Sequence, residues 1–368
     1  MISGGVNGYG SFVHCIRESL SSGGGGGGFI SRFSEHLPLT PGRDFVGAIV
    51  ARGRSVAQFK PGDLVWGAIP PSESGGSHTD YVVTTEKAIA HKPRNLSNVE
   101  AASLPYVGLT AWAAISTFGE LTAQSAYKKR VLILGADEDV GCFAVQLLRY
   151  WGAEVTATTC SSAGSSPDWL QTLTEEGVKC PQQDSEHFLA NYSGEEAFDF
   201  ILDASISSTV ARRHYQLLSK AKLQQNGEGD QSQVLHSKTV YVTLSSPLLG
   251  GLDCLEATGD SAHLSDGGEL GTGTVADAIS DSLSGVQKSG VGAGAPGGLR
   301  FRWATYLPNP KALQHIGDLV ERGAIRPFTA GAPGAATVYD FDRAPEAYQL
   351  VAERPTTLSG ERVVLSNL

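Results

Sequence analysis

An apolar strand that runs into a glycine turn and then a helix, at residues 130–151, constrains the fold more than any other feature of the sequence. Residues 131–135 are VLILG, and the helix that follows shows apolar periodicity through Phe143, Val145, Leu147 and Leu148. Further apolar strand segments alternate with helical ones along the chain, at 153–159, 198–204 and 237–246. Strands alternating with helices predict a parallel sheet covered by helices on both faces.

The turn between strand and helix resembles a glycine-rich loop of the kind that binds dinucleotides. In such loops the glycines let the backbone approach a pyrophosphate, which sits on the helix N-terminus. Here Gly135, Gly141 and Val140 are in place, but the central positions are the acidic Asp137, Glu138 and Asp139. Two interpretations stay open: a dinucleotide site, or a plain turn whose acidic residues cap their own helix.

Carboxylates facing a pyrophosphate would oppose binding. Two unit charges about 4 Å apart interact by roughly 4 kcal/mol at an effective dielectric near 20. If solvent reduces this to about 1–2 kcal/mol per carboxylate, the affinity falls on the order of a hundredfold. The acidic turn therefore predicts weakened binding of the cofactor.

The end of the second strand, Thr158 to Ser161, bears on the choice between NADH and NADPH. Sites specific for NAD usually place Asp or Glu here, to hold the ribose hydroxyl. None is present, which favours NADPH, yet no Arg or Lys follows until Lys179. Cys160 is either a reactive thiol or a small buried hydrophobe.

Composition and short motifs exclude several classes of function. With 28 basic and 38 acidic residues the net charge is −10, which disfavours nucleic-acid binding. No apolar run approaches the roughly 20 residues of a membrane span. The five scattered cysteines and the lack of C-x-x-C and H-E-x-x-H patterns disfavour a disulfide scaffold and a metal centre. They also indicate a reducing compartment.

The rest of the chain predicts a second region and several loops. Short segments between Pro-Gly turns at 37–93 predict a compact all-β unit. Ser97 and Glu100 form a capping-box pattern that predicts a helix start. Two later helices are predicted at 311–323 and 343–353. A strand-like segment is predicted at 325–328 and a terminal strand at 361–368. The Gly-rich or polar segments predict loops, at 23–28, 222–233 and 256–298.

Four segments match a known family in order and spacing: LPLTPGRDFVGAI, FKPGDLVWGAIPP, EAASLPYVGLTAW, and KRVLILGA followed by VG. Together they resemble the medium-chain dehydrogenase/reductase superfamily. Gly42-Arg43-Asp44 stands where the zinc alcohol dehydrogenases of that superfamily have Gly-His-Glu. The resemblance is therefore to the zinc-free, quinone-oxidoreductase-like branch, which has mitochondrial members.

The resemblance implies an α/β fold of two domains. A GroES-like β-barrel domain at 1–107 would be completed by 337–368, and a Rossmann domain with a doubly wound parallel sheet would occupy 108–336. The chain begins where the family is already some way into its first domain, so the first strands of that domain are expected to be missing. MISGGVNGYG lacks the basic and apolar pattern of a targeting peptide.

The resemblance also implies which residues contact the cofactor. The pyrophosphate turn corresponds to Gly135, Ala136, Asp137, Asp139, Val140 and Gly141. Positions at the nicotinamide end correspond to Thr110, Ala204 and Leu244. Positions near the ribose phosphate correspond to Cys160 and Ser161, and a late cofactor contact corresponds to Phe301 and Arg302. No catalytic residue and no metal ligand is assigned.

Arg300 and Arg302, which flank Phe301, leave two interpretations open. They could hold a phosphate through charge-assisted hydrogen bonds. They could equally be a solvated basic pair.

Two functions follow from the resemblance. The first is NADPH-dependent hydride transfer to a quinone or an α,β-unsaturated carbonyl acceptor in mitochondria, with a homodimer as the expected assembly. The second is a cofactor-impaired interaction module with a reticulon-type membrane partner. The second rests on two departures from the family pattern. At 137–139 the family has Ser-Gly-Gly and this chain has Asp-Glu-Asp. At 204–207 the family has Asn-Val-Gly-Gly and this chain has Ala-Ser-Ile-Ser.

Overall fold

The computed structural model describes residues 3–6, 40–70, 75–160, 174–181, 183–192, 197–205, 207–224, 234–245, 300–327, 337–353 and 363–366. The chain divides into two compact units, Met1–Thr110 with Tyr306–Leu368, and Ala111–Thr305. The predicted domain limits at 107/108 and 336/337 stay a prediction, because compact units need not coincide with domains. The predicted loops at 23–28 and 256–298 lie outside the described residues.

The second unit is built on a five-stranded parallel sheet with the order β6-β5-β7-β8-β9. Its strands are β5 (Arg130–Leu134), β6 (Glu154–Thr158), β7 (Phe198–Asp203), β8 (Leu235–Thr243) and β9 (Arg300–Trp303). The helices α6 (Asp139–Tyr150), α8 (Ser185–Ala190) and α9 (Ser208–Gln224) connect them. The predicted parallel α/β fold is confirmed, and β5, β6 and β7 lie close to their predicted limits.

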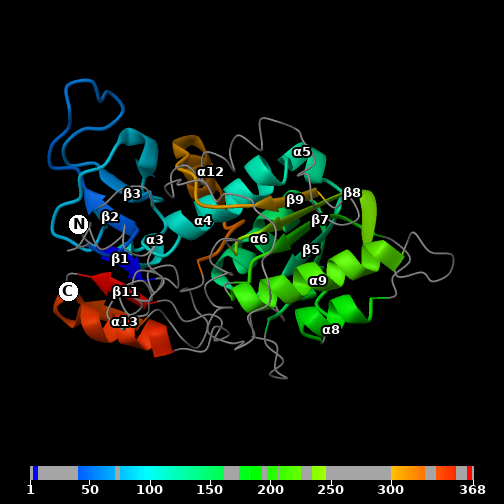
Figure 1. Ribbon diagram of the computed structural model, residues 1–368. Helices are drawn as coiled ribbons and strands as arrows, with labels where there is room; N and C mark the ends of the chain where they lie inside the picture. Colours follow the sequence, from blue (N-terminus) through cyan, green and yellow to red (C-terminus); the bar gives the residue numbers. More distant parts are fainter. Residues whose placement is uncertain are drawn as a thin grey trace, which may run out of the picture. The chain divides into compact units, whose positions relative to one another are not determined.

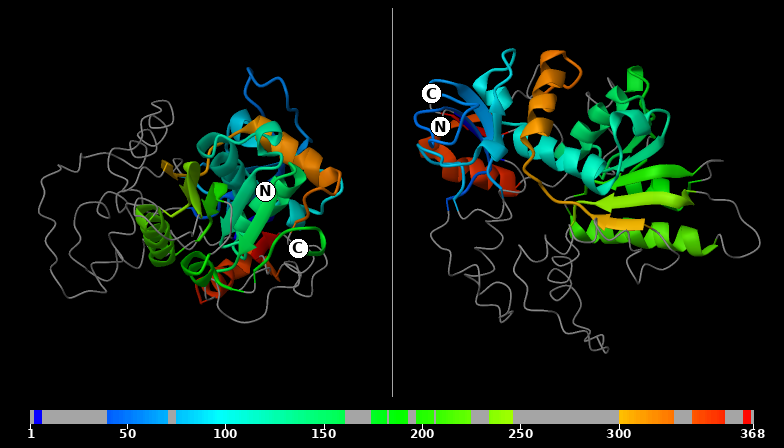
Figure 2. Two further views of the ribbon diagram at one scale, coloured as in Figure 1. Left: turned by 90° about the vertical axis from the view of Figure 1, so that its right-hand side faces the viewer. Right: turned by 90° about the horizontal axis from the view of Figure 1, so that it is seen from above.

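Alternation along the strands gives the sheet two apolar faces. Leu132, Ile201 and Tyr241 point to one face and form a core with residues of α8 and α9. Phe200 points to the other face, beneath the π-helical turn η2 (Ala113–Phe118), where a Cβ atom at Gly119 would lie 2.5 Å from Phe200 Cε2. Figure 1 and Figure 2 show α8 and α9 on one side of this sheet and α5 (Ala123–Ala126) on the other.

The first unit contains a six-stranded sheet with the order β10-β11-β1-β2-β3-β4. Its strands are β1 (Ser3–Val6), β2 (Asp44–Ala48), β3 (Leu64–Ala68), β4 (Ile89–His91), β10 (Thr337–Asp340) and β11 (Val363–Ser366). The pairing is antiparallel except between β10 and β11. Because β11 pairs with β1, strands from the two ends of the chain lie side by side (Figure 1).

The helices of the first unit follow the sequence closely. The capping box is confirmed: Ser97 accepts from Glu100 N, Glu100 reaches back to Ser97 N, and α3 (Asn98–Ala101) begins there. α4 (Pro105–Trp112) follows. α12 (Pro310–Glu321) and α13 (Ala344–Glu353) match the two predicted late helices, and Asn309 caps α12 with Pro310 in its first turn.

Three local predictions were wrong. Residues 79–85 are not a strand, although Tyr81 and Val83 are exposed and Val82 between them packs against the core of the first unit. The β pattern resumes only after the short helix η1 (Glu86–Ala88). The described part of the strand-like 325–328 segment has no strand pairing. At 222–224 the chain is still the last turn of α9 rather than a loop.

Among the described residues, no helix is both long and apolar enough to cross a lipid bilayer.

Candidate functional site

The turn from β5 into α6 has the backbone geometry of a dinucleotide loop. Gly135 adopts φ +75°, a left-handed conformation that favours glycine. A Cβ atom on Gly135 would also meet Cys160 Sγ at 3.0 Å and Ser205 N at 3.2 Å. A Cβ atom on Gly141 would lie 2.1 Å from the carbonyl oxygen of Gly135, so only glycine lets α6 approach the strand end this closely. Both glycines are therefore required by the structure.

Asp139 lies in the first turn of α6, where an acidic residue suits the helix dipole, but Glu138 does not cap the helix. Glu138 is the N-cap residue of α6, but its side chain makes no capping hydrogen bond. It is 7% exposed, and burial, followed by the charges of Asp137 and Asp139, raises the pKa of its carboxyl to about 9. Glu138 is therefore neutral at pH 7, and the turn carries less negative charge than the sequence implied.

Asp137 reaches across to the end of β6. Its Oδ1 accepts a hydrogen bond of 2.8 Å from the backbone N–H of Cys160, two residues past the end of β6. Its side chain is buried, with 8% exposed. The predicted turn residues and the predicted ribose-side residue Cys160 thus come together, and the contact between them is made by an acidic side chain.

Cys160 is partly buried and is not an activated thiol. Its Sγ lies 3.1 Å from Ser205 Oγ, beside the turn. Burial, with the charge of Asp137 next, raises the pKa of the Cys160 thiol well above its ordinary value. A thiolate is the reactive form, so the raised pKa disfavours the reactive-thiol interpretation, although Cys160 is only partly buried.

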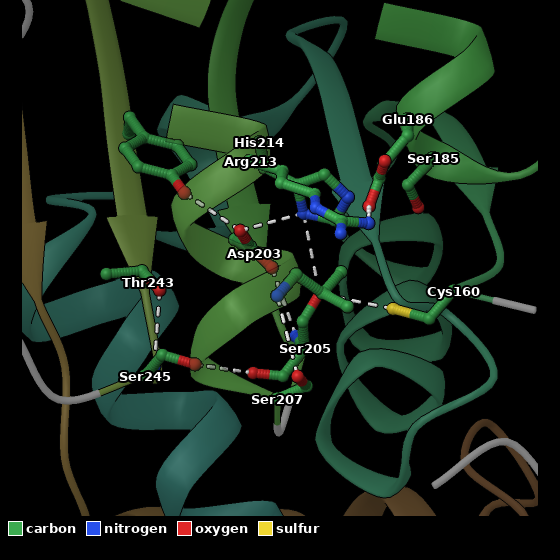
Figure 3. A network of polar contacts seen from close by, with 12 residues as sticks. Cys160, Ser185, Glu186, Asp203, Ser205, Ser207, Arg213, His214, Thr243 and Ser245 are labelled. Carbon is green, nitrogen blue, oxygen red and sulfur yellow. Dashed lines mark hydrogen bonds and ion pairs between the residues drawn. The ribbon is translucent and has the colours of Figure 1, made fainter. Parts of the chain in front are cut away.

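A buried polar network lies at the neighbouring strand end. Asp203, the last residue of β7, accepts hydrogen bonds at Oδ2 from His214 Nδ1 (3.0 Å) and from Tyr241 OH (2.8 Å). Its Oδ1 accepts from Ser205 N at 3.1 Å. Figure 3 shows Asp203 and His214 pointing toward one another, with Ser205 between them and Cys160. Asp203 and His214 are both 0% exposed.

These bonds hold Asp203 as a carboxylate. Burial raises its pKa, but the hydrogen bond and charge of His214, with bonds from Ser205 and Tyr241, outweigh burial and lower it below the ordinary value. Tyr241 shifts in the opposite direction: its burial, with the charge of Asp203 next, raises the pKa of the phenol. The network therefore contains one buried negative charge, which hydrogen bonds from His214, Tyr241 and Ser205 N stabilise.

The network is not a nucleophilic triad, although it contains Ser, His and Asp. In a triad the two imidazole nitrogens serve different partners, one the nucleophile and the other the carboxylate. Here His214 Nδ1 faces both Asp203 and, at 3.5 Å, Ser205 Oγ. His214 Nε2 is buried and has no hydrogen-bond partner among the described residues. The network holds the end of β7 beside the turn.

Phe301 and Arg302 lie in β9, on opposite faces of the sheet. The ring of Phe301 packs against Tyr215 and Tyr241. Arg302 instead donates to Phe118 O (2.6 Å) and to Glu120 (2.7 Å). Arg300 also pairs with Glu120, at 3.0 Å. The basic pair therefore forms an ion-pair cluster around Glu120, whose pKa it lowers, chiefly through the hydrogen bond from Arg302.

The other predicted cofactor residues fall in different places. Ala204 and Leu244 are buried just past the ends of β7 and β8, and Ala204 N donates to Leu134 O at 2.9 Å, so both lie at the same sheet edge as the turn. Thr110 belongs to the first unit, where its hydroxyl donates to Tyr106 O at 2.7 Å. Ser161 lies outside the described residues.

Sequence reasoning missed Asp203, His214 and Tyr241 as a group. A signal was present, since the strand FDFILD ends an apolar run on an acidic residue that needs a buried partner. His214 also lies in a helical stretch beside Tyr215 and Leu218, on the apolar side. In the part of the chain that the structure describes, no group of three His, Cys, Asp or Glu side chains could hold a metal ion.

The sequence of the chain is similar to those of several known proteins. Residues 15–94 match the model of the alcohol dehydrogenase GroES-like domain. The chain is 34% identical over 314 residues to the mitochondrial NAD(P)H oxidoreductase RTN4IP1 of Bos taurus, covering 85% of this chain and 67% of that protein. It is 29% identical over 323 residues to the mitochondrial reticulon-4-interacting protein 1 of Caenorhabditis elegans, covering 87% and 74%.

Among solved structures, the quinone oxidoreductase of Coxiella burnetii superposes with a TM-score of 0.63 at 19% sequence identity. The match covers 100% of this chain and 88% of that one. At this identity the likeness concerns the fold.

Proposed function

The chain belongs to the medium-chain dehydrogenase/reductase superfamily, among the quinone-oxidoreductase-like relatives of the NAD(P)H oxidoreductase RTN4IP1, and from this premise we propose that it transfers hydride from a reduced nicotinamide dinucleotide to a quinone or an α,β-unsaturated carbonyl compound. The observation that carries the proposal is the β5–α6 turn. Its two glycines keep the close approach of strand and helix that a bound pyrophosphate requires.

The residues of the turn fit a dinucleotide better than their sequence suggests. Glu138 is neutral at pH 7, and Asp137 is turned toward Cys160. The Glu138 side chain makes no capping bond, and the N-terminus of a helix such as α6 is a favourable place for a phosphate. The weakening expected from three carboxylates is therefore smaller than about a hundredfold.

The bound dinucleotide supplies the hydride, and the protein supplies its orientation and a dry site. In this proposal the first-turn amides of α6, around Asp139 and Gly141, hold the pyrophosphate. Ala204 and Leu244, small or apolar and buried at the sheet edge, line the nicotinamide end and exclude water.

The reaction is proposed to be independent of zinc. Arg43 stands where the zinc-dependent relatives have a histidine. A guanidinium has no lone pair to give a metal ion and stays protonated, so Arg43 cannot replace that histidine as a ligand.

The sequence predicted NADPH as the dinucleotide. That prediction rested on the lack of an acidic residue at the end of β6. In the structure Asp137 places a carboxylate there, from the neighbouring turn. This carboxylate bears on the choice between the two dinucleotides.

A mitochondrial location and a homodimer are part of the proposal. The location is supported by the mitochondrial relatives. A reticulon-type membrane protein is proposed as a partner because one relative is called reticulon-4-interacting protein.

A second candidate function is an interaction module that has lost its cofactor. The observation that favours it is the Asp137 carboxylate on the Cys160 amide, which places a negative charge beside the turn.

Steady-state turnover separates the two candidates. The purified full-length chain would be given NADH or NADPH with a panel of quinones and enones, and loss of the reduced nicotinamide absorbance would be followed. Acceptor-dependent, saturable oxidation is the expected result. Failure of every acceptor, with both dinucleotides, would favour the interaction module.

A further inference from the structure

The charge that stands beside the end of β6 is the starting observation. In dinucleotide-binding sheets the end of the second strand lies next to the adenosine ribose, and an acidic side chain there selects NAD over NADP. In this chain no acidic residue occurs in the strand end itself, at 158–161. Asp137 supplies the carboxylate from the adjacent turn, with Oδ1 held 2.8 Å from Cys160 N.

Two basic side chains near this strand end are already paired with carboxylates, His187 with Asp184 at 2.8 Å and Arg213 with Glu186 at 3.3 Å. Residues 161–178 contain neither Lys nor Arg. Asp184 forms a β-bridge with Thr159 and so adds a second carboxylate nearby. Its side chain is 13% exposed. Figure 3 shows Arg213 and Glu186 in this neighbourhood.

Resting on the proposed function, we propose that Asp137 makes this chain select NADH over NADPH. The two dinucleotides differ only in the 2′-phosphate of the adenosine ribose. That phosphate would meet the Asp137 carboxylate and would find the Cys160 N–H already taken. NADH carries ribose hydroxyls at this point, and these hydroxyls can donate hydrogen bonds to a carboxylate.

Asp137→Asn is the informative variant because the amide keeps the shape and the acceptor oxygen of the aspartate. The hydrogen bond from Cys160 N–H survives, and only the charge is removed. Asp139→Asn is the matched control, since it removes the same charge from the first turn of α6. Pyrophosphate is common to both dinucleotides, so this control should shift their affinities together.

The experiment is isothermal calorimetry of NADH and NADPH with the full chain and the two variants, with circular dichroism to confirm that each is folded. For the wild type we expect the Kd for NADPH to exceed that for NADH by about tenfold or more, which corresponds to about 1.4 kcal/mol. Asp137→Asn should reduce this ratio to near one by improving NADPH binding. Asp139→Asn should leave the ratio unchanged.

Three results would overturn the inference. One is equal or tighter binding of NADPH by the wild type. Another is a ratio of the Kd for NADPH to the Kd for NADH that Asp137→Asn does not change. Binding of neither dinucleotide by the wild type would reject the proposed function itself, and the inference with it.

Discussion

Glu138 shows how much the state of one side chain depends on its burial. The pKa of its carboxyl is about 9 in the folded protein, against an ordinary value of 4.5. Between these two pH values the folded protein holds a proton that the unfolded chain has released. Its contribution to stability is therefore fully present below about pH 4.5 and is lost as the pH rises toward about 9.

Glu138→Gln removes this dependence, because the amide is neutral at every pH. We expect the variant to become more stable relative to the wild type as the pH rises from 5 to about 9, with the gain levelling off above that value. Urea unfolding at a series of pH values measures the difference. Glu154→Gln, at an exposed position, is the control. A constant difference between Glu138→Gln and wild type across this range would show that Glu138 is ionised in the folded protein.

The buried pair of Asp203 and His214 can be compared with an exposed pair of the same chemistry. His214 Nδ1 lies 3.0 Å from Asp203 with both side chains fully buried, whereas His187 Nδ1 lies 2.8 Å from Asp184 with the histidine 73% exposed. Removing one partner of a buried pair leaves an uncompensated charge and costs about 3–5 kcal/mol. An exposed pair contributes about 0–1 kcal/mol.

We therefore expect His214→Phe to lower the free energy of unfolding by about 3–5 kcal/mol, and His187→Phe to change it by less than about 1 kcal/mol. Chemical denaturation of both variants is the measurement. The double variant with Asp203→Asn should recover part of the loss, since the buried charge is gone. Similar small effects of both histidine substitutions would contradict the role assigned to the network.

At the scale of the element, the β5–α6 unit depends on Gly141. A Cβ atom there would collide with the Gly135 carbonyl oxygen at 2.1 Å, so strand and helix would have to separate. We expect Gly141→Ala to destabilise the protein by about 3 kcal/mol or more and to abolish dinucleotide binding. Gly53→Ala is the control, because the nearest atom to its Cβ would be 4.0 Å away. Thermal unfolding and dinucleotide titration of the two variants test this; a folded Gly141→Ala that binds normally would refute it.

Elements with a local signal were predictable from the sequence. The strand VLILG, the capping box at Ser97 and the helix predicted at 311–323, which is α12, each depend on residues a few positions apart. The β pattern predicted through 79–85 was wrong because residues that favour strands do not show whether a neighbouring strand is available to pair.

The site was only partly predictable, for a related reason. Its backbone, with Gly135 and Gly141, follows from a local motif. The contacts that set its charge join residues far apart in sequence, such as Asp137 with Cys160 and Asp203 with Tyr241. Both contacts depend on which strands are neighbours, and the sequence of one strand does not reveal this.

At the scale of the whole molecule, the first unit depends on strands from both ends of the chain. β11 lies between β1 and β10, and its Val363, Val364 and Leu365 are at most 2% exposed. We expect Leu365→Ala to cost about 2–5 kcal/mol, as for other buried leucines. Val83→Ala, at a side chain that is 92% exposed, should have almost no effect.

Native-state hydrogen exchange shows where the loss falls. The amides of β1 and β2 should lose protection in Leu365→Ala, while those of β5 and β7 in the second unit keep theirs. Equal loss of protection in both units would mean that the chain unfolds as one cooperative body.

We expect the β5–α6 turn to bind a reduced nicotinamide dinucleotide despite its acidic residues. Hydrogen exchange of the full chain, with and without saturating NADH, measures this at single amides. The amides of Asp139, Val140 and Gly141, at the start of α6, should exchange more slowly when NADH is present. NADH that leaves these amides unchanged, or that does not bind at all, would contradict it.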